Sequence, residues 1–406
     1  GRPAAETISA AARRAMLDVL VGPRSPREFL LGPLWLAAPP AQIARDGERC
    51  LAWSGRLAPS PEEPDDAAAW LALTVGREPP MPWGHYAFIL ADAGVRSLTL
   101  RCAPSGTASL FYARAGELLL FSTSVRPLLA HSAVPRRMDP DAAAGFLIHG
   151  APFWPDETLF AGIGRLSPGS KLDADAGVVH APQRLRPVRV ARPRSFEPEP
   201  LREALSKAVM RSIGRAGEAA VSFSAGFDSQ LVASMAAREV GPERVTGLTY
   251  EYSEPGIFSE APDACAAARR LGIAHRVETF TFEDYWRALP EALWLSEDWT
   301  PFVCVRYLLL ARRAAAVGLP PLMTGSGLEV LMGSLVYGEE MLRLAAAVSG
   351  LREAVWPAAL WKRTFRRPGP FTVLERIILG QLHPALKPPM IDSYYPVLCV
   401  LRHAGA

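Results

Sequence analysis

The sequence predicts two domains of different class: an α+β domain in the first half and an α/β domain with a parallel sheet in the second. Short apolar runs separated by turns fill residues 29–122, which is typical of an antiparallel sheet with few helices. Helical and strand patterns alternate from residue 200 onward, which indicates a parallel sheet with helices on both faces. Residues 181–199 are rich in Pro and Arg without periodicity and predict a linker. We therefore expect domains over residues 1–180 and 200–406.

The composition limits the classes of function. The chain has 406 residues, 49% apolar and 21% charged, so it is long enough for two domains with separate cores. Its net charge of +3 is small, which gives no sign of a nucleic-acid partner. We find no run of about eighteen apolar residues and no signal-like start, so we expect no membrane segment and a cytoplasmic protein. The five cysteines lack C-x-x-C spacing, which argues against zinc or a disulfide framework.

The apolar runs of the first half are its expected strands. An amphipathic helix is expected over residues 7–20 and another helix over 65–73. A third helix opens at Asp139 and Pro140 and closes at Gly150, since an acidic cap, a first-turn Pro and a final Gly mark helix boundaries. The expected strand segments are residues 29–38, 50–53, 86–92, 97–101, 109–114 and 118–122.

The second half is expected to alternate regularly. Its predicted helices are residues 200–214, 228–239, 259–272 and 302–317. Its predicted strands are residues 218–223, 244–251, 275–279 and 320–324. Ligands bind parallel sheets at the carboxyl ends of the strands. The segments that follow the strands 218–223 and 320–324 are therefore candidate site segments.

The first site segment reads Ser222-Phe-Ser-Ala-Gly-Phe-Asp-Ser229. It predicts a buried strand that turns sharply through residues 224–226 and opens into a helix whose first turn holds Asp228 and Ser229. A helix start attracts a phosphate, because its N–H groups are unpaired and its dipole is positive there. Gly226 allows close backbone approach, and Asp228 can hold a Mg²⁺ that neutralises phosphates. The expected phosphate-binding residues are Ser222, Ser224, Ala225, Gly226, Phe227, Asp228 and Ser229.

The segment also has to be compared with two other kinds of strand-turn-helix corner. No Lys follows the glycine, so the segment is not a Walker-type P-loop. An ordinary strand-turn-helix corner with Asp228 or Ser229 as the cap stays open for the short pattern alone. The stretch resembles the PP-loop of the adenylating ATP pyrophosphatases, usually Ser-Gly-Gly-x-Asp-Ser, and departs from it by Ala225 in place of the first glycine. That resemblance implies an α/β PP-loop ATP pyrophosphatase domain that uses ATP.

The first half resembles the glutamine amidotransferase domain of class B asparagine synthetases. Four segments carry the resemblance by their order and spacing, namely residues 84–92, 98–107, 110–112 and 119–129. The family implies a four-layer sandwich of the Ntn-hydrolase type, whose glutaminase uses a cysteine as the first residue. Here Gly1 stands first and Cys50 is the first cysteine. The expected domain is therefore glutamine amidotransferase-like without glutamine hydrolysis, because the nucleophilic thiol is missing.

The second site segment reads Thr324-Gly-Ser-Gly-Leu-Glu329 and resembles the second ATP-site motif of the asparagine synthetase family. The resemblance implies that Gly325 and Gly327 approach the nucleotide. It also implies that Glu329 binds Mg²⁺ together with Asp228, a carboxylate for the family's Asp. The open alternative is a flexible Gly-Ser-Gly turn followed by an acidic residue at a helix start.

Ser326 distinguishes among the relatives. Asparagine synthetases carry Glu at this position and β-lactam synthetases carry Tyr, and a serine hydroxyl is a poor base near neutral pH. In this feature and in the missing first cysteine, the chain is most similar to the lasso peptide cyclases. That resemblance implies ATP- and Mg²⁺-dependent adenylation of an Asp or Glu side chain in a precursor peptide. The peptide's α-amine then closes a macrolactam, and AMP and pyrophosphate are released.

Further roles follow from the same resemblance. The amine-activating base is expected to be Glu297 or Asp298, with Ser326 beside the reaction, although Glu297 and Asp298 are equally consistent with helix capping. A leader peptidase and a leader-binding protein are the expected partners besides the precursor peptide. Two alternatives stay open: a β-lactam synthetase-like or asparagine synthetase-like ligase acting on a small molecule, and a silent ATP-binding scaffold.

Overall fold

The computed structural model describes residues 9–326 except for eleven gaps. These gaps are residues 20–26, 32–33, 39–41, 58–70, 72–83, 105–107, 150–155, 176–177, 186–197, 254–258 and 298–300. Contacts divide the chain into two compact units, and each is treated separately below. Unit 1 comprises residues 1–217 and 281–309, and unit 2 comprises residues 218–280 and 310–406. The predicted linker and the 65–73 helix lie almost entirely outside the described residues.

Unit 1 contains an antiparallel sheet in the order β11-β10-β6-β5-β4-β3, with β12 also paired to β10. Its strands are β3 (Ile43–Asp46), β4 (Arg49–Leu57), β5 (Gly84–Asp92), β6 (Ser97–Cys102), β10 (Ser170–Asp175), β11 (Val178–Val179) and β12 (Gln183–Arg184). Alternation along β5 sets its two faces, because successive side chains of a strand point in opposite directions. Ala87, Ile89 and Ala91 join one core cluster, whereas Tyr86 and Phe88 join another.

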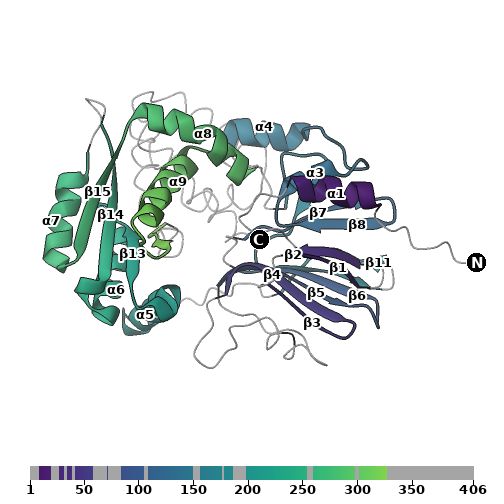
Figure 1. The fold of residues 1–406 in the computed structure, drawn as a ribbon, viewed down its shortest axis with the longest axis horizontal. Helices are drawn as coiled ribbons and strands as arrows, with labels where there is room; N and C mark the ends of the chain where they lie inside the picture. The colour runs from purple at the N-terminus through teal and green to yellow at the C-terminus, as the bar shows by residue number, and fades with distance from the viewer. Residues whose placement is uncertain are drawn as a thin grey trace, which may run out of the picture. The chain divides into compact units, whose positions relative to one another are not determined.

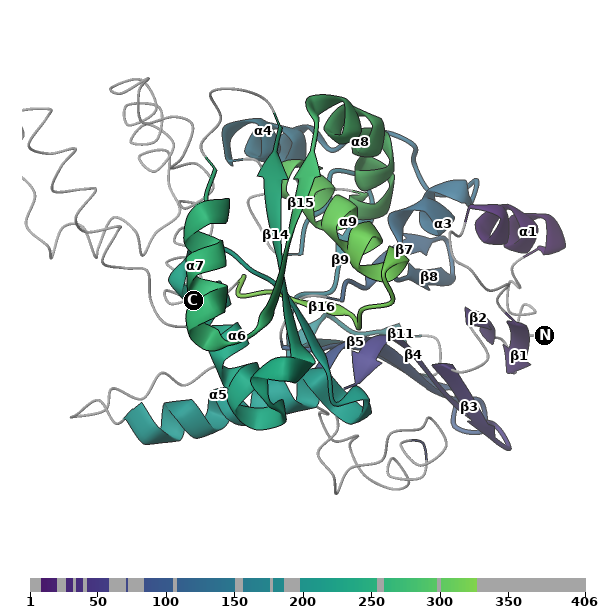
Figure 2. The same ribbon diagram turned by 60° about the vertical axis from the view of Figure 1, so that its left-hand side comes forward.

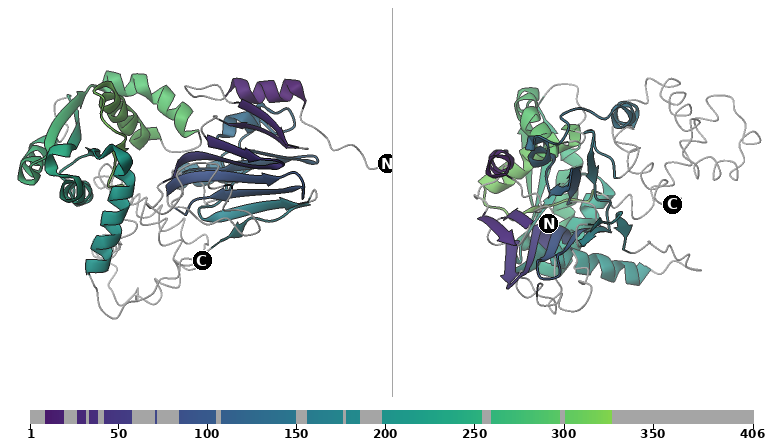
Figure 3. Two further views of the ribbon diagram at one scale, coloured as in Figure 1. Left: turned by 60° about the horizontal axis from the view of Figure 1, so that its bottom comes forward. Right: turned by 90° about the vertical axis from the view of Figure 1, so that its right-hand side faces the viewer.

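A second sheet of unit 1 packs on the first. It runs in the order β8-β7-β9, with β7 (Phe111–Ala115), β8 (Leu118–Ser122) and β9 (Ile163–Arg165). The other face of this sheet meets α1 (Ala10–Asp18) and α3 (Val125–Ala130) through Met16, Val125 and Leu128. Figure 1 shows this layering, and in Figure 3 (left) the purple α1 lies along the stacked strands. The described residues thus form one helix layer on two sheets, and the four-layer arrangement stays a prediction.

The remaining elements of unit 1 include two that the sequence reading missed. The hairpin β1 (Arg27–Leu31) and β2 (Leu34–Ala38) falls on the expected apolar run, and α4 (Pro140–His149) begins as predicted after Asp139. The Oδ1 atom of Asp139 accepts from the backbone N–H groups of residues 141 and 142, at 3.1 Å each. The short α3 and the long α8 (Phe282–Ser296) were not predicted. Unit 1 also contains α5 (Pro198–Ile213) and the start of α9 (Pro301–Ala316).

Unit 2 is built on a parallel sheet in the order β15-β14-β13-β16. Its strands are β13 (Ala219–Ser222), β14 (Val245–Tyr252), β15 (Ala274–Phe280) and β16 (Leu322–Met323), and its helices include α6 (Phe227–Val240) and α7 (Ala261–Leu271). Figure 2 shows α7 alongside β14 and β15. The central strands are buried on both faces, with Val221 and Leu248 at 0% exposure. The predicted parallel α/β sheet is confirmed.

Within the residues that the structure describes, no helix combines the length and the apolar character needed to cross a bilayer.

Candidate functional site

The first site segment forms the connection between β13 and α6 in unit 2. The strand ends at Ser222, and the helix begins at Phe227 with Gly226 as its cap residue in extended conformation. No side chain caps this helix start through a hydrogen bond, as far as the described residues show. The loop residues 224–226 lie at the carboxyl end of β13, where parallel sheets bind ligands. The predicted strand-turn-helix corner is therefore present.

Ser229 holds the loop together. Its hydroxyl lies 3.0 Å from the backbone nitrogen of Ser224 and 2.9 Å from that residue's Oγ atom. It also lies 3.2 Å from the carbonyl oxygen of Ser224 and 3.1 Å from that of Gly226. Ser229 is 7% exposed, so these contacts are shielded from water. A single buried hydroxyl thus fixes both ends of the turn.

The remaining loop groups are also engaged. The backbone N–H of Gly226 donates to Ser224 Oγ at 3.1 Å, and Gln230 donates from its side-chain amide to the carbonyl of Ala225 at 2.7 Å. The backbone N–H of Ala225 donates to Glu260 Oε2 at 3.2 Å. Glu260 is the residue before α7 and was not among the predicted site residues. Its carboxylate therefore occupies one of the amides that an anionic ligand would use.

The second site segment contacts the first through its backbone. A methyl group added at Gly325 would lie 2.7 Å from the carbonyl carbon of Asp228 and 2.8 Å from the nitrogen of Ser229. Only glycine fits there, because real Cβ atoms essentially never come within 3.0 Å of such atoms. The structure thus brings Gly325 against Asp228, as the two-motif reading requires. Ser326 follows on the surface, while Gly327 and Glu329 lie outside the described residues.

The residues present fit a magnesium ion in part. Asp228 stands in the first turn of α6, where its carboxylate is half-buried. Mg²⁺ is commonly bound by one or two carboxylates together with substrate phosphates and water, so one protein carboxylate at a phosphate loop suits it. The described residues contain no group of three His, Cys, Asp or Glu side chains placed to hold a metal. Asp228 would hold the ion, which supplies charge neutralisation on the phosphates.

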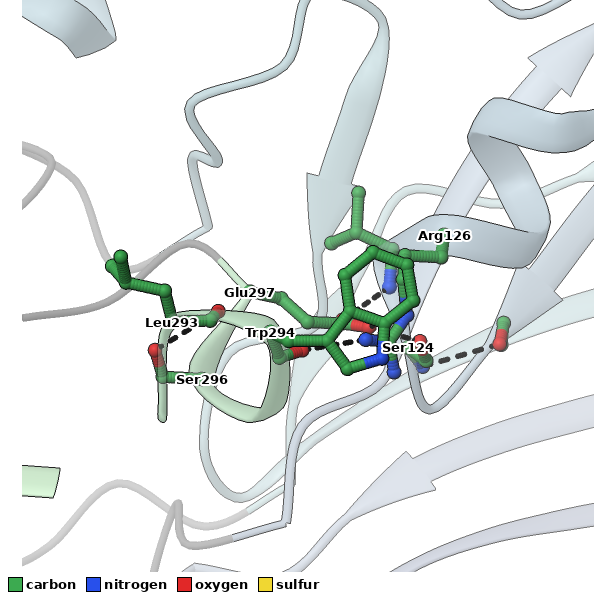
Figure 4. Close-up of polar contacts among 8 residues, drawn as sticks. Ser124, Arg126, Leu293, Trp294, Ser296 and Glu297 are labelled. Carbon is green, nitrogen blue, oxygen red and sulfur yellow. Dashed lines mark hydrogen bonds and ion pairs between the residues drawn. The ribbon is translucent and has the colours of Figure 1, made fainter. Parts of the chain in front are cut away.

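Glu297 lies where its side chain contacts the start of another helix. It ends α8 with a positive φ of 59°, and its side chain reaches the start of α3. The backbone N–H of Val125 donates to Glu297 Oε2 at 2.5 Å, and Ser124 donates its hydroxyl to Oε1. The Nε atom of Arg126 lies 3.0 Å from the same Oε1 atom (Figure 4). We call these four residues the Glu297 clamp.

Arg126 completes the clamp from the other side. Its Nη1 atom donates to the carbonyl of Trp294 at 2.5 Å, and its guanidinium lies 4.1 Å from the centre of the Trp294 ring. The Glu297 side chain is 9% exposed. A hydroxyl, an amide and a guanidinium thus hold this carboxylate at the start of α3. These contacts favour the capping alternative for Glu297, and its catalytic role stays a prediction. Asp298 lies outside the described residues and stays a prediction.

The cysteines of the first half are unsuited to nucleophilic catalysis. Burial raises the pKa of the Cys50 thiol to about 11. Burial also raises the pKa of Cys102 to about 12, against smaller opposing effects of a hydrogen bond to Leu110 and the charge of Arg165. Both thiols are therefore protonated near neutral pH, and the thiolate is the reactive form.

Two domain families match the chain. Residues 200–373 match the asparagine synthase family. Residues 80–184 match the glutamine amidotransferase domain family. The amidotransferase match precedes the asparagine synthase match along the chain, as the resemblances of the two halves predict.

Solved structures give weaker likenesses. A glutamine-dependent NAD⁺ synthetase from Acinetobacter baumannii, in complex with ADP, is 19% identical over 40% of this chain and 31% of its own, with a TM-score of 0.27. An NH₃-dependent NAD synthetase from Campylobacter jejuni is 16% identical over 50% of this chain and 94% of its own, with a TM-score of 0.26. The glutamine phosphoribosylpyrophosphate amidotransferase from B. subtilis is 14% identical over 58% and 48%, with a TM-score of 0.24. The chain thus spans about a third of the first structure's length, and at these TM-scores none indicates what it binds.

Proposed function

We propose that this chain, whose two domain matches support the asparagine synthetase-like superfamily, is an ATP-dependent amide ligase that closes a macrolactam ring in a precursor peptide. The asparagine synthase match supports ATP-dependent amide ligation in general. The peptide substrate and the ring closure are the finer part of the proposal. They rest on the resemblance of the second site segment to the lasso peptide cyclases.

The contact between the two site segments carries the ligase proposal. Gly325 packs on the backbone of Asp228 and Ser229 so closely that no side chain fits between them. An accidental corner at α6 would not require a glycine from another strand end at this point. A phosphate loop needs such support, because its amides have to keep their direction when the ligand's charge arrives.

The proposed chemistry has two steps. A side-chain carboxylate of the peptide attacks the α-phosphate of ATP, which forms an acyl-adenylate and releases pyrophosphate at residues 224–229. The peptide's α-amine then attacks the acyl carbon, an amide bond forms, AMP leaves and the amine loses a proton. Holding amine and acyl carbon together in one folded peptide supplies much of the rate. Excluding water protects the adenylate from hydrolysis.

The proton acceptor for the amine is proposed to be Asp298, because Glu297 is committed to the clamp. Ser326 is exposed, and it is proposed to lie beside the reacting groups. A leader peptidase and a leader-binding protein are proposed partners, because the precursor has to present a free α-amine before ring closure.

The test is mass spectrometry of a leaderless core peptide incubated with the full chain, ATP and Mg²⁺. The expected result is that the peptide loses the mass of one water while AMP forms in equal amount. With Asp228→Ala, we expect neither cyclised peptide nor AMP. AMP and pyrophosphate without a cyclised peptide would point to the small-molecule ligase alternative. No ATP turnover with any acid would favour the silent scaffold and overturn the proposal.

A further inference from the structure

The strand that leads into the phosphate loop ends in an unusual hydrogen bond. The backbone N–H of Phe223 donates to the carbonyl of Leu248 at 2.8 Å, which continues the pairing of β13 with β14. The carbonyl of Phe223 instead accepts from the hydroxyl of Thr249, also at 2.8 Å. Thr249 is 1% exposed, so this bond is fully buried. The hydroxyl therefore fixes the direction of the peptide bond that enters the loop at Ser224.

A second bond fixes the hydroxyl itself. The Nε2 atom of His275 lies 2.7 Å from Thr249 Oγ1. A carbonyl oxygen only accepts, so the single hydroxyl hydrogen of Thr249 is directed to Phe223, and the hydrogen shared with His275 has to come from Nε2. The Nδ1 atom of His275 then has a lone pair, and the Cys265 thiol lies 3.4 Å from it as a donor. The network thus selects one neutral tautomer of His275.

We propose that Thr249 and His275 are positioning residues for the pyrophosphate of ATP, an inference that rests on the proposed function. The bonds run in one direction, from the Cys265 thiol through His275 and Thr249 to the Phe223 carbonyl. None of these side chains is among the loop residues. They act by setting the peptide that precedes Ser224, whose nitrogen and Oγ atom both bind Ser229.

The environment of the network supports this role. The ring of His275 also makes an edge contact with the ring of Phe223, with centroids 5.7 Å apart. Gly247 lies below Phe223, and a methyl group there would come within 3.0 Å of the Phe223 Cβ atom. Phe223 itself is 2% exposed. Packing and hydrogen bonds together therefore hold the backbone of Phe223. We expect loss of one hydrogen bond to reorient the peptide bond that enters the loop without unfolding the strand.

The experiment measures binding of inorganic pyrophosphate and of AMP to the full chain by calorimetry with Mg²⁺ present. Thr249→Val keeps the shape but removes the hydroxyl, and Thr249→Ser keeps the hydroxyl. His275→Leu removes the donor, and His275→Gln keeps an N–H near the Nε2 position. We expect Thr249→Val and His275→Leu to weaken pyrophosphate binding about tenfold. The first leaves the buried Phe223 carbonyl without its donor, and the second leaves the buried Thr249 hydroxyl oxygen without its donor. Thr249→Ser and His275→Gln should stay within about threefold of the native chain.

The outcomes separate this inference from the proposed function. The inference is supported if Thr249→Val and His275→Leu weaken pyrophosphate binding and leave AMP binding unchanged, while Thr249→Ser and His275→Gln retain pyrophosphate binding. A parallel loss for both ligands, or a lower melting temperature without rescue, shows a general packing role and overturns it. Equal pyrophosphate binding by native chain and Thr249→Val overturns the inference alone. If the native chain binds neither ATP nor pyrophosphate, the proposed function is overturned as well.

Discussion

The starts of α3 and α6 each face a carboxylate of the same chain, but they hold it in different ways. At α3, Glu297 is bound by a hydroxyl, a backbone amide and the guanidinium of Arg126. At α6, Glu260 meets the single amide of Ala225 at 3.2 Å. A helix start attracts anions in both cases. The carboxylate at α3 has a cation of its own, whereas the one at α6 has a single amide. Under the proposed function, we expect the α6 loop to exchange Glu260 for a phosphate more readily than the α3 start releases Glu297.

The largest effect is expected from Asp228→Asn, which keeps the shape of the α6 corner but removes its charge. We expect the rate of AMP formation to fall at least about 100-fold, the scale of a lost electrostatic contact to the transition state. The measurement is AMP release with the peptide substrate, checked against Glu239→Gln farther along the same helix. A change below about threefold would show that Asp228 is only a cap.

Glu297→Ala should break the α3 corner. We expect the free energy of unfolding of unit 1 to fall by about 2–3 kcal/mol, because Arg126 loses its partner while remaining 17% exposed. Urea unfolding with hydrogen exchange of the α3 and α8 amides provides the measurement. The matched control is Glu283→Ala, whose ion pair with Arg287 is exposed at both ends and contributes well under about 1 kcal/mol. Equal losses for the two variants would contradict the clamp.

Gly325→Ala should disturb the α6 corner from the second site segment. The added methyl group meets backbone atoms of Asp228 and Ser229, so the backbone has to shift. We expect pyrophosphate affinity to fall about tenfold, as for a displaced hydrogen-bond partner. At Gly226 an added methyl would meet the Ser224 hydroxyl at 3.1 Å and, under the proposed function, the phosphate, so Gly226→Ala tests the ligand approach separately. Unchanged pyrophosphate affinity in Gly325→Ala would refute the contact between the two site segments.

Glu260→Gln is expected to increase the affinity for pyrophosphate at the start of α6. Removing the charge that occupies the Ala225 amide should tighten pyrophosphate binding about threefold, because less repulsion opposes the incoming anion. Calorimetry at several Mg²⁺ concentrations measures it. Weaker binding that worsens as Mg²⁺ is lowered would instead show that Glu260 helps to hold the ion.

The smallest effect is expected for the pH dependence of the stability of unit 2, to which His275 contributes. Burial lowers the pKa of His275 from its ordinary value of 6.5. The unfolded chain therefore takes up a proton first as the pH falls, so stability decreases as the pH drops through about 6.5 and levels off below the lowered pKa. The check is the melting temperature of unit 2 against pH, beside His275→Gln. An unchanged pH slope in that variant would contradict the assignment.

The comparison also shows what the sequence could predict. The elements of unit 2 followed from the regular alternation of helix and strand, which is a local pattern, and the loop from Ser224 to Ser229 lies in one stretch. The helix α8 was missed although Thr281 and Asp284 form a capping box, because Pro290 and exposed aromatics interrupt its pattern. Glu297 meets Val125 across 172 positions and Ala225 meets Glu260 across 35. No spacing rule reveals such contacts, so the clamp and the role of Glu260 required coordinates.

The division of the chain into units affects its synthesis. Residues 281–309 belong to unit 1 although they follow most of the unit 2 sheet in sequence. A ribosome therefore releases residues 1–217 well before their last partner exists, and at usual elongation rates the delay is roughly 5–20 s. During that interval Ser124, the backbone N–H of Val125 and the guanidinium of Arg126 lack the Glu297 carboxylate that they bind in the folded unit. Cutting the gene between the two sequence domains would leave the first fragment in that state permanently.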